Sequence, residues 1–510
     1  MLFTSLEFIV FLTVLIVLYY TIAKNRFQWQ LLLAASLAFY AFSGWWNLFY
    51  IASTIISSYF AGRAMGRLEA GRDAYLKEAK LSKEDAKAYK ASVKAKKRIW
   101  LIACLTFNFA VLAATKYAGL MISKGADTGF FGFLVPVGIS FYTFQAMGYI
   151  IDRYRGKGGE HSLFRLALFV SFFPQLIQGP ISRFDDLKAT LFAPHSFNGA
   201  AFAAAGQRVL WGFFKKLVIA DRLLPAVTEL TSDLGAYGGV YVIAAVLLYA
   251  VRLYADFTGG IDITIGVAEM LGIRVKENFN MPFYSKSIAE YWRRWHITMG
   301  TWFKDYLFYP ISVSRPMLGL MKSAKAAFGE NFGKRVPVYL STIILWFMTG
   351  LWHGTTANYI AWGLANGLVI IISQELTPAY KAFHQRFNLK GKRIWNALEI
   401  FRTFWLMCFI RAFDIYAGVG ETLKAVGSVV TGPHTLPNLV FDGIGVSDYI
   451  AAGAGVAVMI IAGRIKRRGK PWINKAAVRY AACLLLALAI VVFGVYGMGY
   501  DASQFIYNRF

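Results

Sequence analysis

Charged residues are scarce in this chain of 510 residues. Only 16% are Asp, Glu, Lys or Arg, whereas a soluble domain carries about 25%. Hydrophobic residues make up 57% of the chain, and they gather in blocks long enough to cross a bilayer. This composition excludes soluble, disordered and fibrous proteins. We therefore expect an all-α, polytopic integral membrane protein with about 11–13 membrane-embedded helices.

Cysteine is also rare, and the usual metal and phosphate motifs are missing. The three cysteines, Cys104, Cys408 and Cys483, lie far apart, each inside an apolar segment. This spacing excludes a disulfide framework and a cysteine-rich zinc site. The sequence has no HExxH motif, no glycine-rich phosphate loop and no paired CxxC motif. We expect neither a bound metal nor a bound cofactor.

Acidic residues are half as frequent as basic ones: 28 Asp and Glu against 54 Lys and Arg give a net charge of +26. Nucleic-acid binding would require stacking aromatics interleaved with the basic residues, and the lysine-rich loop 67–98 has only Tyr75 and Tyr89. The basic clusters instead alternate with basic-poor loops along the chain. The rich loops include 67–98 and 274–335, and the poor ones include 123–130 and 418–447. Positive loops face the cytoplasm, so the charge predicts membrane orientation and excludes a nucleic-acid partner.

No cleavable signal is evident at the amino terminus. The apolar segment Leu6–Ala23 lacks a basic preceding region and a small-residue cleavage site, so we interpret it as an anchored first helix. With the basic loops in the cytoplasm, the amino terminus and residues 501–510 lie outside. The charged cytoplasmic loop 67–98 mixes acidic residues with its lysines, which is typical of a pair of solvated helices near anionic membrane lipids.

One apolar stretch does not fit a simple span. Leu163–Pro180 is interrupted by Pro174, Gly179 and Pro180, and both of its flanks are basic. Irregular backbone at membrane depth is tolerated only where protein or a water-filled cavity covers it. We interpret Phe172–Ile181 as a re-entrant element lining a cavity, with a proline-kinked helix as the alternative.

Two of the six histidines lie in apolar or aromatic surroundings. His353 ends the apolar run from Pro337 and is flanked by Gly350 and Gly354, which would let a substrate approach closely. Ionisable groups at membrane depth are functional candidates, and a neutral imidazole suits removal of a hydroxyl proton near neutral pH. A buried histidine bonded to a backbone carbonyl explains the same pattern equally well.

His296 lies in a stretch dense in Trp and Arg, from Tyr291 to Thr298. On the residues alone, an interfacial amphipathic helix is the better explanation, with Trp292, Trp295 and Trp302 as an aromatic belt. In that interpretation Arg293 and Arg294 would bind lipid headgroups.

Two further polar clusters interrupt the apolar pattern. Asp256 and Asp262 follow an apolar segment and precede Gly266. They either cap a broken helix, which simple physics favours, or line a polar cavity. Gln178, in the sequence Gln-Gly-Pro-Ile, is similarly a turn residue first and a cavity wall second.

At these motifs the chain resembles a known family. Tyr291-Trp-Arg-Arg-Trp-His-Ile-Thr298, the following Trp302-Phe-Lys-Asp-Tyr-Leu307 and Gly350-Leu-Trp-His-Gly354 resemble the membrane-bound O-acyltransferase family. Supporting stretches span nearly the whole chain: Trp45-Trp46-Asn47, Pro136 to Gln145, Gln178 to Ile181, Asp256 to Asp262 and Phe505 to Phe510. The branch that the chain resembles is the bacterial alginate O-acetylase type.

The resemblance implies one domain over residues 1–510, with helices around a central tunnel open to both sides. The motif region 274–335 would lie on the cytoplasmic side and lead to His353. The family's invariant histidine corresponds to His353 and the companion position to His296, both as catalytic residues. Further candidates for shaping the tunnel or binding substrate are Asp256, Asp262, Gln178, Arg293, Trp295, Asn278 and Trp352.

The resemblance also implies the reaction and its partners. An acyl group, acetyl in the alginate branch, would pass from acetyl-CoA or an acyl carrier protein in the cytoplasm to a cell-surface polysaccharide or cell-wall glycan. A separate extracytoplasmic acyltransferase would be the partner, and the location would be the bacterial inner membrane. Lys304 and residues 355–358 depart from the usual pattern and leave the acceptor open. The alternatives are D-alanyl transfer to teichoic acid and a non-enzymatic polysaccharide or lipid transporter.

Overall fold

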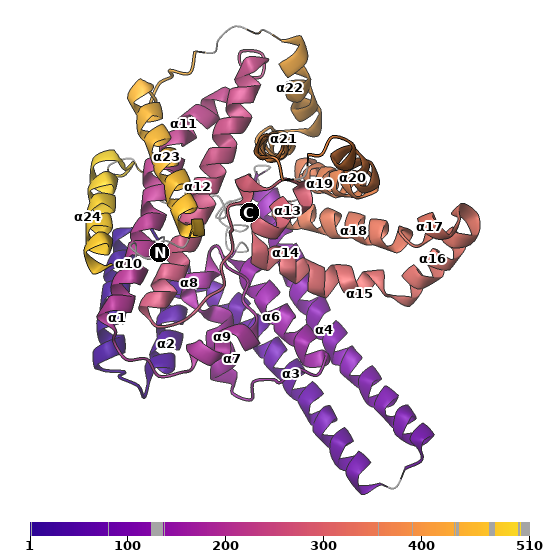
Figure 1. The fold of residues 1–510 in the computed structure, drawn as a ribbon. Coiled ribbons are helices and arrows are strands. Elements are labelled where there is room, and N and C mark those ends of the chain that lie inside the picture. The colour runs from indigo at the N-terminus through magenta and orange to yellow at the C-terminus, as the bar shows by residue number, and fades with distance from the viewer. Residues whose placement is uncertain are drawn as a thin grey trace. The chain divides into compact units, whose positions relative to one another are not determined.

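The computed structural model describes residues 1, 3–79, 81–123, 136, 138–354, 356–389, 391–432, 434, 438–468, 475–497 and 500. Within this part of the chain the regular elements are helices, with no strand among them (Figure 1). The described chain divides into two compact units. Unit 1 is residues 1–205 and 264–276, and unit 2 is residues 206–263 and 277–510.

Unit 1 is built from the amino-terminal helices. These are α1 (Leu6–Thr21), α2 (Gln28–Ala41), α3 (Asn47–Glu78), α4 (Lys83–Ser123), α6 (Ile139–Tyr154), α7 (Leu163–Ser171), α8 (Phe173–Leu176) and α9 (Phe184–Leu191). Helix α6 is apolar on nearly all sides, and its residues from Ile139 to Ile150 are buried. It forms the core of this unit together with α7, whose residues from Leu166 to Ser171 are also buried.

Unit 2 holds the rest of the chain, and two long helices, α10 (Gly199–Phe213) and α12 (Val240–Met270), belong partly to each unit. Its first helices are π-helical η1 (Phe214–Ala220), α11 (Asp221–Leu230), 3₁₀ η2 (Pro282–Tyr284), α13 (Ile288–Arg294), α14 (Ile297–Phe303), π-helical η3 (Lys304–Phe308) and α15 (Tyr309–Ser312). The remainder are α16 (Arg315–Phe328), α17 (Glu330–Gly333), α18 (Val336–His353), α19 (Ala357–Glu375), α20 (Thr377–Arg386), α21 (Arg393–Ile410), 3₁₀ η4 (Arg411–Asp414), α22 (Val419–Thr431), α23 (Val446–Arg468) and α24 (Ala476–Phe493).

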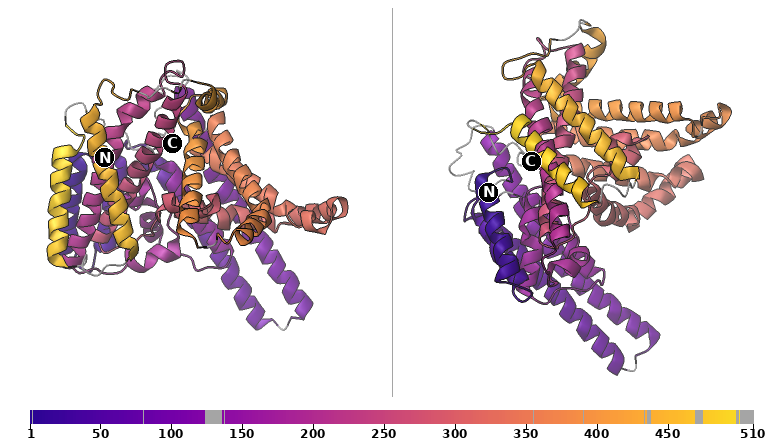
Figure 2. Two further views of the ribbon diagram at one scale, coloured as in Figure 1. Left: turned by 45° about the horizontal axis from the view of Figure 1, so that its top comes forward. Right: turned by 60° about the vertical axis from the view of Figure 1, so that its left-hand side comes forward.

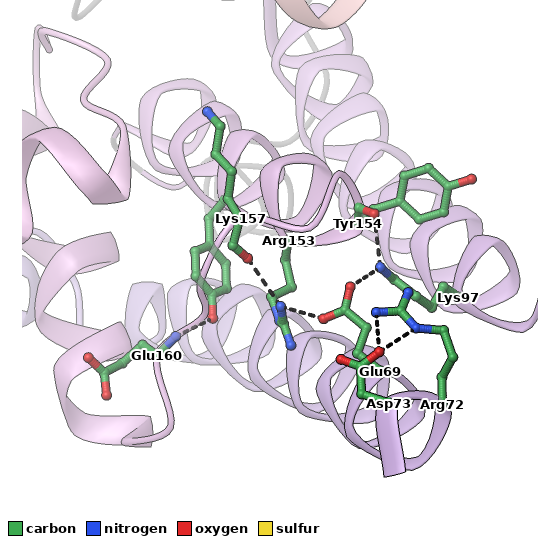
Figure 3. A network of polar contacts seen from close by, with 9 residues as sticks. Glu69, Arg72, Asp73, Lys97, Arg153, Tyr154, Lys157 and Glu160 are labelled. Carbon is green, nitrogen blue, oxygen red and sulfur yellow. Dashed lines mark hydrogen bonds and ion pairs between the residues drawn. The ribbon is translucent and has the colours of Figure 1, made fainter. Parts of the chain in front are cut away.

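The charged loop 67–98 is the tip of a long helical hairpin. Figures 1 and 2 show α3 and α4 running side by side, and the break between them spans only residues 79–82. At the base of the hairpin Glu69 forms ion pairs with Lys97 and, at 2.7 Å, with Arg153 of α6 (Figure 3). Lys97 also donates to the carbonyl of Tyr154 at 3.0 Å. The expected pair of solvated helices is confirmed, and these contacts fix it to α6.

The stretch 163–180 is broken, as its prolines and glycine predict. Helix α7 ends at Ser171 after nine residues, which is about 14 Å of rise and too short to cross a bilayer. The short α8 follows, and residues 166–182 are all buried. A proline-kinked ordinary helix is therefore wrong, because the helix stops at Phe172 rather than bending around Pro174. The structure supports a re-entrant element, and its lining of a cavity stays a prediction.

Several helices have the length and composition of membrane spans. Five described helical segments qualify, or six if the bent pair α19 and α20 is one span. They are 83–116, 240–270, 330–353, 446–467 and 476–493. Helix α1 is apolar but has only 16 residues. The chain is thus an all-α multi-pass membrane protein, and the count of 11–13 embedded helices, which includes shorter segments, stays a prediction.

Candidate functional site

His353 is the last residue of α18, and aromatic rings surround its imidazole. Its ring centroid lies 4.7 Å from that of Trp352 and 4.7 Å from that of Trp362 on α19. Tyr359 stacks nearly parallel to it at 6.4 Å. The side chain is half-buried. The neighbouring rings hold the imidazole in place, and part of it stays accessible to another molecule.

Glycines at the end of α18 let α19 approach closely. A Cβ on Gly350 would lie 2.4 Å from the carbonyl oxygen of Tyr359, and one on Gly363 would lie 2.3 Å from that of Trp346. A Cβ on Gly354 would meet the ring of Tyr359 at 2.1 Å. The expectation that Gly350 and Gly354 leave space for a substrate is therefore wrong. Helix α19 occupies that space and brings Tyr359 and Trp362 to His353.

His296 is fully buried at the start of α14, with 0% of its surface exposed. Its backbone is in the left-handed region with φ 46°, a conformation that costs a non-glycine residue about 1 kcal/mol or more. Trp295 and Trp302 are 3% and 7% exposed. The interfacial helix with an aromatic belt, which the residues alone favoured, is therefore wrong.

Asn278 holds His296 in place. Its Oδ1 accepts from the backbone N–H and the hydroxyl of Thr298, at 3.0 and 2.9 Å. Because a backbone N–H only donates, this contact identifies the atom as oxygen. The same oxygen lies 3.3 Å from Nδ1 of His296, so Nδ1 carries the proton and Nε2 is the unprotonated ring nitrogen. Asn278, a candidate from the sequence, is thus a positioning residue for His296.

Burial lowers the pKa of His296 from its usual 6.5 to about 3. The residue lies outside the helices that qualify as membrane spans. At neutral pH its imidazole is therefore uncharged. A histidine with so low a pKa is a weak proton acceptor, and its fixed orientation is its main chemical property.

Trp352 lies between the two histidines. Its ring centroid is 6.1 Å from that of His296 and 4.7 Å from that of His353. On the other side of His296, Phe257 of α12 makes an edge contact at 4.9 Å. The structure therefore brings both predicted catalytic histidines together around Trp352.

Trp295 belongs to the wall behind His296. It stacks on Tyr291 with the rings 5.6 Å apart, and the guanidinium of Arg411 lies 4.4 Å from its ring centroid. Arg411 is itself buried and pairs with Asp414 at 3.0 Å. The candidate Trp295 is therefore structural support within the site. Arg293 is exposed, and the structure does not place it with the buried residues around His296.

Asp256 and Asp262 do not cap a broken helix, because α12 is continuous from Val240 to Met270. Both point at lysines of the π-helical η1. Asp256, fully buried, pairs with Lys216 at 2.7 Å, and Lys216 also pairs with Asp221 at 2.7 Å. Asp262 pairs with Lys215 at 2.5 Å. The capping interpretation is wrong, and the physical reason is that buried lysines on the neighbouring segment compensate these carboxylates.

Gln178 lies in unit 1, just before the cis peptide bond between Gly179 and Pro180. Its side chain is 0% exposed, and neither its amide oxygen nor its amide nitrogen has a hydrogen-bond partner among the described residues. Buried amides of this kind need a water or a ligand group. Gln178 thus lies at a buried turn, and its role as a cavity wall stays a prediction.

Several residues of the site were not predicted. Lys215, Lys216, Arg411 and Asp414 lie in apolar segments of the sequence, and the rule that singled out His353 also applies to them. Trp362 carries a buried indole N–H that has no hydrogen-bond partner in the described part of the chain. No sequence signal distinguishes it from the other tryptophans, because only the packing of α19 on α18 brings it to His353.

Among the described residues, no three His, Cys, Asp or Glu side chains lie close enough together to hold a metal ion. The site therefore consists of two histidines, their aromatic neighbours and the hydrogen bonds of Asn278. Such a group of side chains can bind a hydroxyl and remove its proton, but it offers no nucleophilic Cys or Ser next to a base.

Comparison with known proteins identifies a family that matches this chain. A sequence model described as "MBOAT, membrane-bound O-acyltransferase family" matches residues 142–416. This range contains His296, His353 and all of their contacts described above.

Curated relatives support the same family. The "Probable alginate O-acetylase AlgI" of Pseudomonas aeruginosa is 34% identical over 390 residues, which cover 74% of this chain and 66% of that protein. The peptidoglycan O-acetyltransferase of Helicobacter pylori is 29% identical, covering 71% and 67%. The teichoic acid D-alanyltransferase of Bacillus subtilis is 30% identical, covering 55% and 68%. The chain belongs to the membrane-bound O-acyltransferase family, whose members are acyltransferases.

Proposed function

We propose that this protein transfers an acetyl or other short acyl group from a cytoplasmic thioester to a hydroxyl of a cell-surface polysaccharide or cell-wall glycan. The observation that carries the proposal is the pair of histidines around Trp352 inside a family of acyltransferases. The relatives named for alginate and peptidoglycan O-acetylation favour acetyl and a glycan acceptor. The bacterial inner membrane is the location that we propose.

His353 is the proposed general base. It accepts the proton of the acceptor hydroxyl while the hydroxyl oxygen attacks the thioester carbonyl carbon. The carbon–sulfur bond then breaks, and the thiol leaves with the proton that His353 gives back. The half-buried position of His353 among aromatic rings supports this role, since the rings limit water while one side remains accessible.

His296 is proposed to orient the thioester donor. The Nδ1 proton of His296 is directed at Asn278. Nε2 can therefore accept a hydrogen bond from the thioester substrate, but it cannot donate one. This tautomer favours orientation of the donor over stabilisation of the developing oxyanion. The indole N–H of Trp362, which has no hydrogen-bond partner among the residues that the structure describes, is the better candidate for the oxyanion, because it can donate a hydrogen bond beside His353.

The donor and the partner follow from the same proposal. Acetyl-CoA or an acyl carrier protein would supply the thioester from the cytoplasm, where the basic residues of 274–335 favour an anionic donor. A separate extracytoplasmic acyltransferase would pass the acyl group on. Helix α18 supports transfer across the membrane, because its 18 residues span about 27 Å and separate His353 at its carboxyl end from Arg335 at its amino end.

D-alanyl transfer to teichoic acid is the second candidate function. The observation in its favour is the 30% identity to the Bacillus subtilis D-alanyltransferase. The match covers less of this chain than the match to the alginate relative, 55% against 74%. Supplying acetyl and D-alanyl thioesters in parallel to the purified protein would separate the two functions.

The decisive experiment replaces the proposed base. His353→Ala in the full chain, purified in detergent, should lower acyl transfer from a radiolabelled thioester by about 10²- to 10⁴-fold. His161→Ala is the matched control, because His161 is exposed in unit 1 and its loss should leave the rate unchanged. A thermal unfolding curve like that of the wild type would show that the His353→Ala variant is folded. Retained activity in that folded variant would contradict the proposal. A transporter would show no thioester turnover in either protein.

A further inference from the structure

A basic cavity of about 430 Å³ lies in unit 2 beside α10, α12 and α23. Four cationic and two anionic side chains line it: Arg208, Lys215, Lys466, Arg467, Asp262 and Glu277. The lining therefore carries an excess of two positive charges. No step of the proposed acyl transfer uses these residues.

Asp262 lies at the inner wall of the cavity, and Glu277, whose side chain is 51% exposed, lies nearer its mouth. Asp262 accepts from Lys215 at 2.5 Å and from Arg208 at 2.9 Å, and Arg208 also pairs with Glu277 at 2.7 Å. The Lys215 side chain is only 4% exposed. At the mouth Lys466 lies 3.9 Å from Glu277 and is 81% exposed. The lining thus carries more cations than carboxylates, which favours an anion with oxygens in several directions, such as phosphate.

A second cavity, of about 280 Å³, adjoins the first and is lined mainly by apolar side chains. The two cavities share Tyr254, Met281, Met459 and Gly463. The apolar cavity continues between α12, α21 and α23, where Val251, Phe283, Phe404 and Val456 line it. The combined space therefore has a cationic end and a hydrocarbon-like end.

Helix α23 lines both the cationic and the apolar cavity. This helix has the length and composition of a membrane span, and Val458, Ile460 and Ile461 on it are exposed. Its carboxyl-terminal turn carries the cations of the cavity mouth. Basic side chains at the end of a membrane span lie at the depth of lipid headgroups.

We propose that the two cavities together bind one phospholipid. Its phosphate lies against Arg208, Lys466 and Arg467, and one acyl chain enters the apolar cavity past Gly463. The phosphates of a thioester donor have the same chemistry as the headgroup. The lipid is favoured because the space next to the cations is apolar, and only a phosphate with a hydrocarbon chain fills both parts.

The junction of the two cavities offers a direct test. An ideal Cβ on Gly463 lies 3.2 Å from Cε of Met281, so Gly463→Leu would fill the passage at the cost of moving a flexible side chain. Native mass spectrometry of the purified full chain, titrated with phosphatidylglycerol, should show at least about tenfold weaker binding in this variant. Gly453→Leu on the same exposed helix is the control, since nothing lies within 4 Å of its Cβ, and it should bind like wild type.

The headgroup is tested separately. The double variant Lys466→Gln, Arg467→Gln should weaken phosphatidylglycerol binding by about tenfold or more, and Arg464→Gln outside the cavity should not. Dioleoylglycerol, which lacks the phosphate, should bind no better to wild type than to the double variant. Equal phosphatidylglycerol binding by wild type and Gly463→Leu would overturn the proposal. So would displacement of the lipid by coenzyme A together with loss of coenzyme A binding in the double variant, which would assign the cavity to donor phosphates.

Discussion

The two histidines of the site are held by opposite kinds of surroundings, although Trp352 touches both. His296 is fully buried, in a left-handed backbone conformation, with Nδ1 at the amide oxygen of Asn278. His353 is half-buried at a helix end, and ring packing holds it. The surroundings of His296 thus suit a histidine that keeps one orientation. Those of His353 suit a histidine that exchanges a proton with a substrate.

The largest effect on the rate of acyl transfer is expected from replacing each histidine, one at a time, with glutamine. His353→Gln should lower the rate of acyl transfer by about 10³-fold, which is about 4 kcal/mol, because glutamine cannot take a proton. His296→Gln should lower it by only about tenfold, because an amide can replace one hydrogen-bond partner. Steady-state kinetics with a soluble hydroxyl acceptor measure both. Equal losses in the two variants would remove the distinction between base and orienting residue.

The next largest effect is expected on stability, from replacing Asn278, whose amide oxygen is the polar contact of His296. Asn278→Ala would leave the N–H and hydroxyl of Thr298 and the Nδ1 proton of His296 without their acceptor. Thermal unfolding in detergent should report a loss of about 3 kcal/mol. Thr301→Ala on the exposed side of α14 is the control and should be close to neutral. A loss as small as that of the control would show that Asn278 does not hold the site.

Much of the fold was predictable because it depends on local composition. The apolar blocks, the helical hairpin of α3 and α4 and the break at Phe172 follow from segment length, charge and proline position. His353 was also singled out from the residues, since ionisable residues in apolar runs are few, whereas only the resemblance to the family singled out His296. These features need no knowledge of which segments pack together.

Predictions failed where contacts between distant segments decide the outcome. Asp256 and Asp262 were expected first to cap a broken helix, but lysines some 40 residues away compensate them inside a continuous helix. The alternative, a polar cavity, is confirmed for Asp262. Gly350 and Gly354 were assigned to substrate access, but Tyr359 fills that space. In both cases the sequence shows the unusual residue, and only the packing shows its partner.

A third prediction uses pH to separate the two histidines. The folded pKa of His296 is about 3 and the unfolded value about 6.5, so folding favours the neutral form. Its stabilising contribution is complete above pH 6.5 and is lost as the pH falls toward 3. Between pH 7 and pH 5 the protein should lose about 2 kcal/mol through this group. Unfolding of His296→Gln at both pH values should show a loss smaller by that amount, whereas an unchanged pH dependence would contradict the low pKa.

The smallest effect is expected on kcat, from replacing Trp362. It tests whether the rings around His353 act by packing alone or also through the indole N–H. Trp362→Phe keeps an aromatic ring beside His353 but removes an indole N–H that has no hydrogen-bond partner among the described residues. Removing an unsatisfied buried donor should leave stability unchanged or slightly raised. If the N–H binds the oxyanion, kcat should nevertheless fall by about tenfold, or about 1.4 kcal/mol. Trp395→Phe provides the opposite pattern, because its N–H donates to His384 at 2.9 Å, and its loss should lower stability and spare kcat. An unchanged kcat in Trp362→Phe would mean that the rings around His353 act by packing alone.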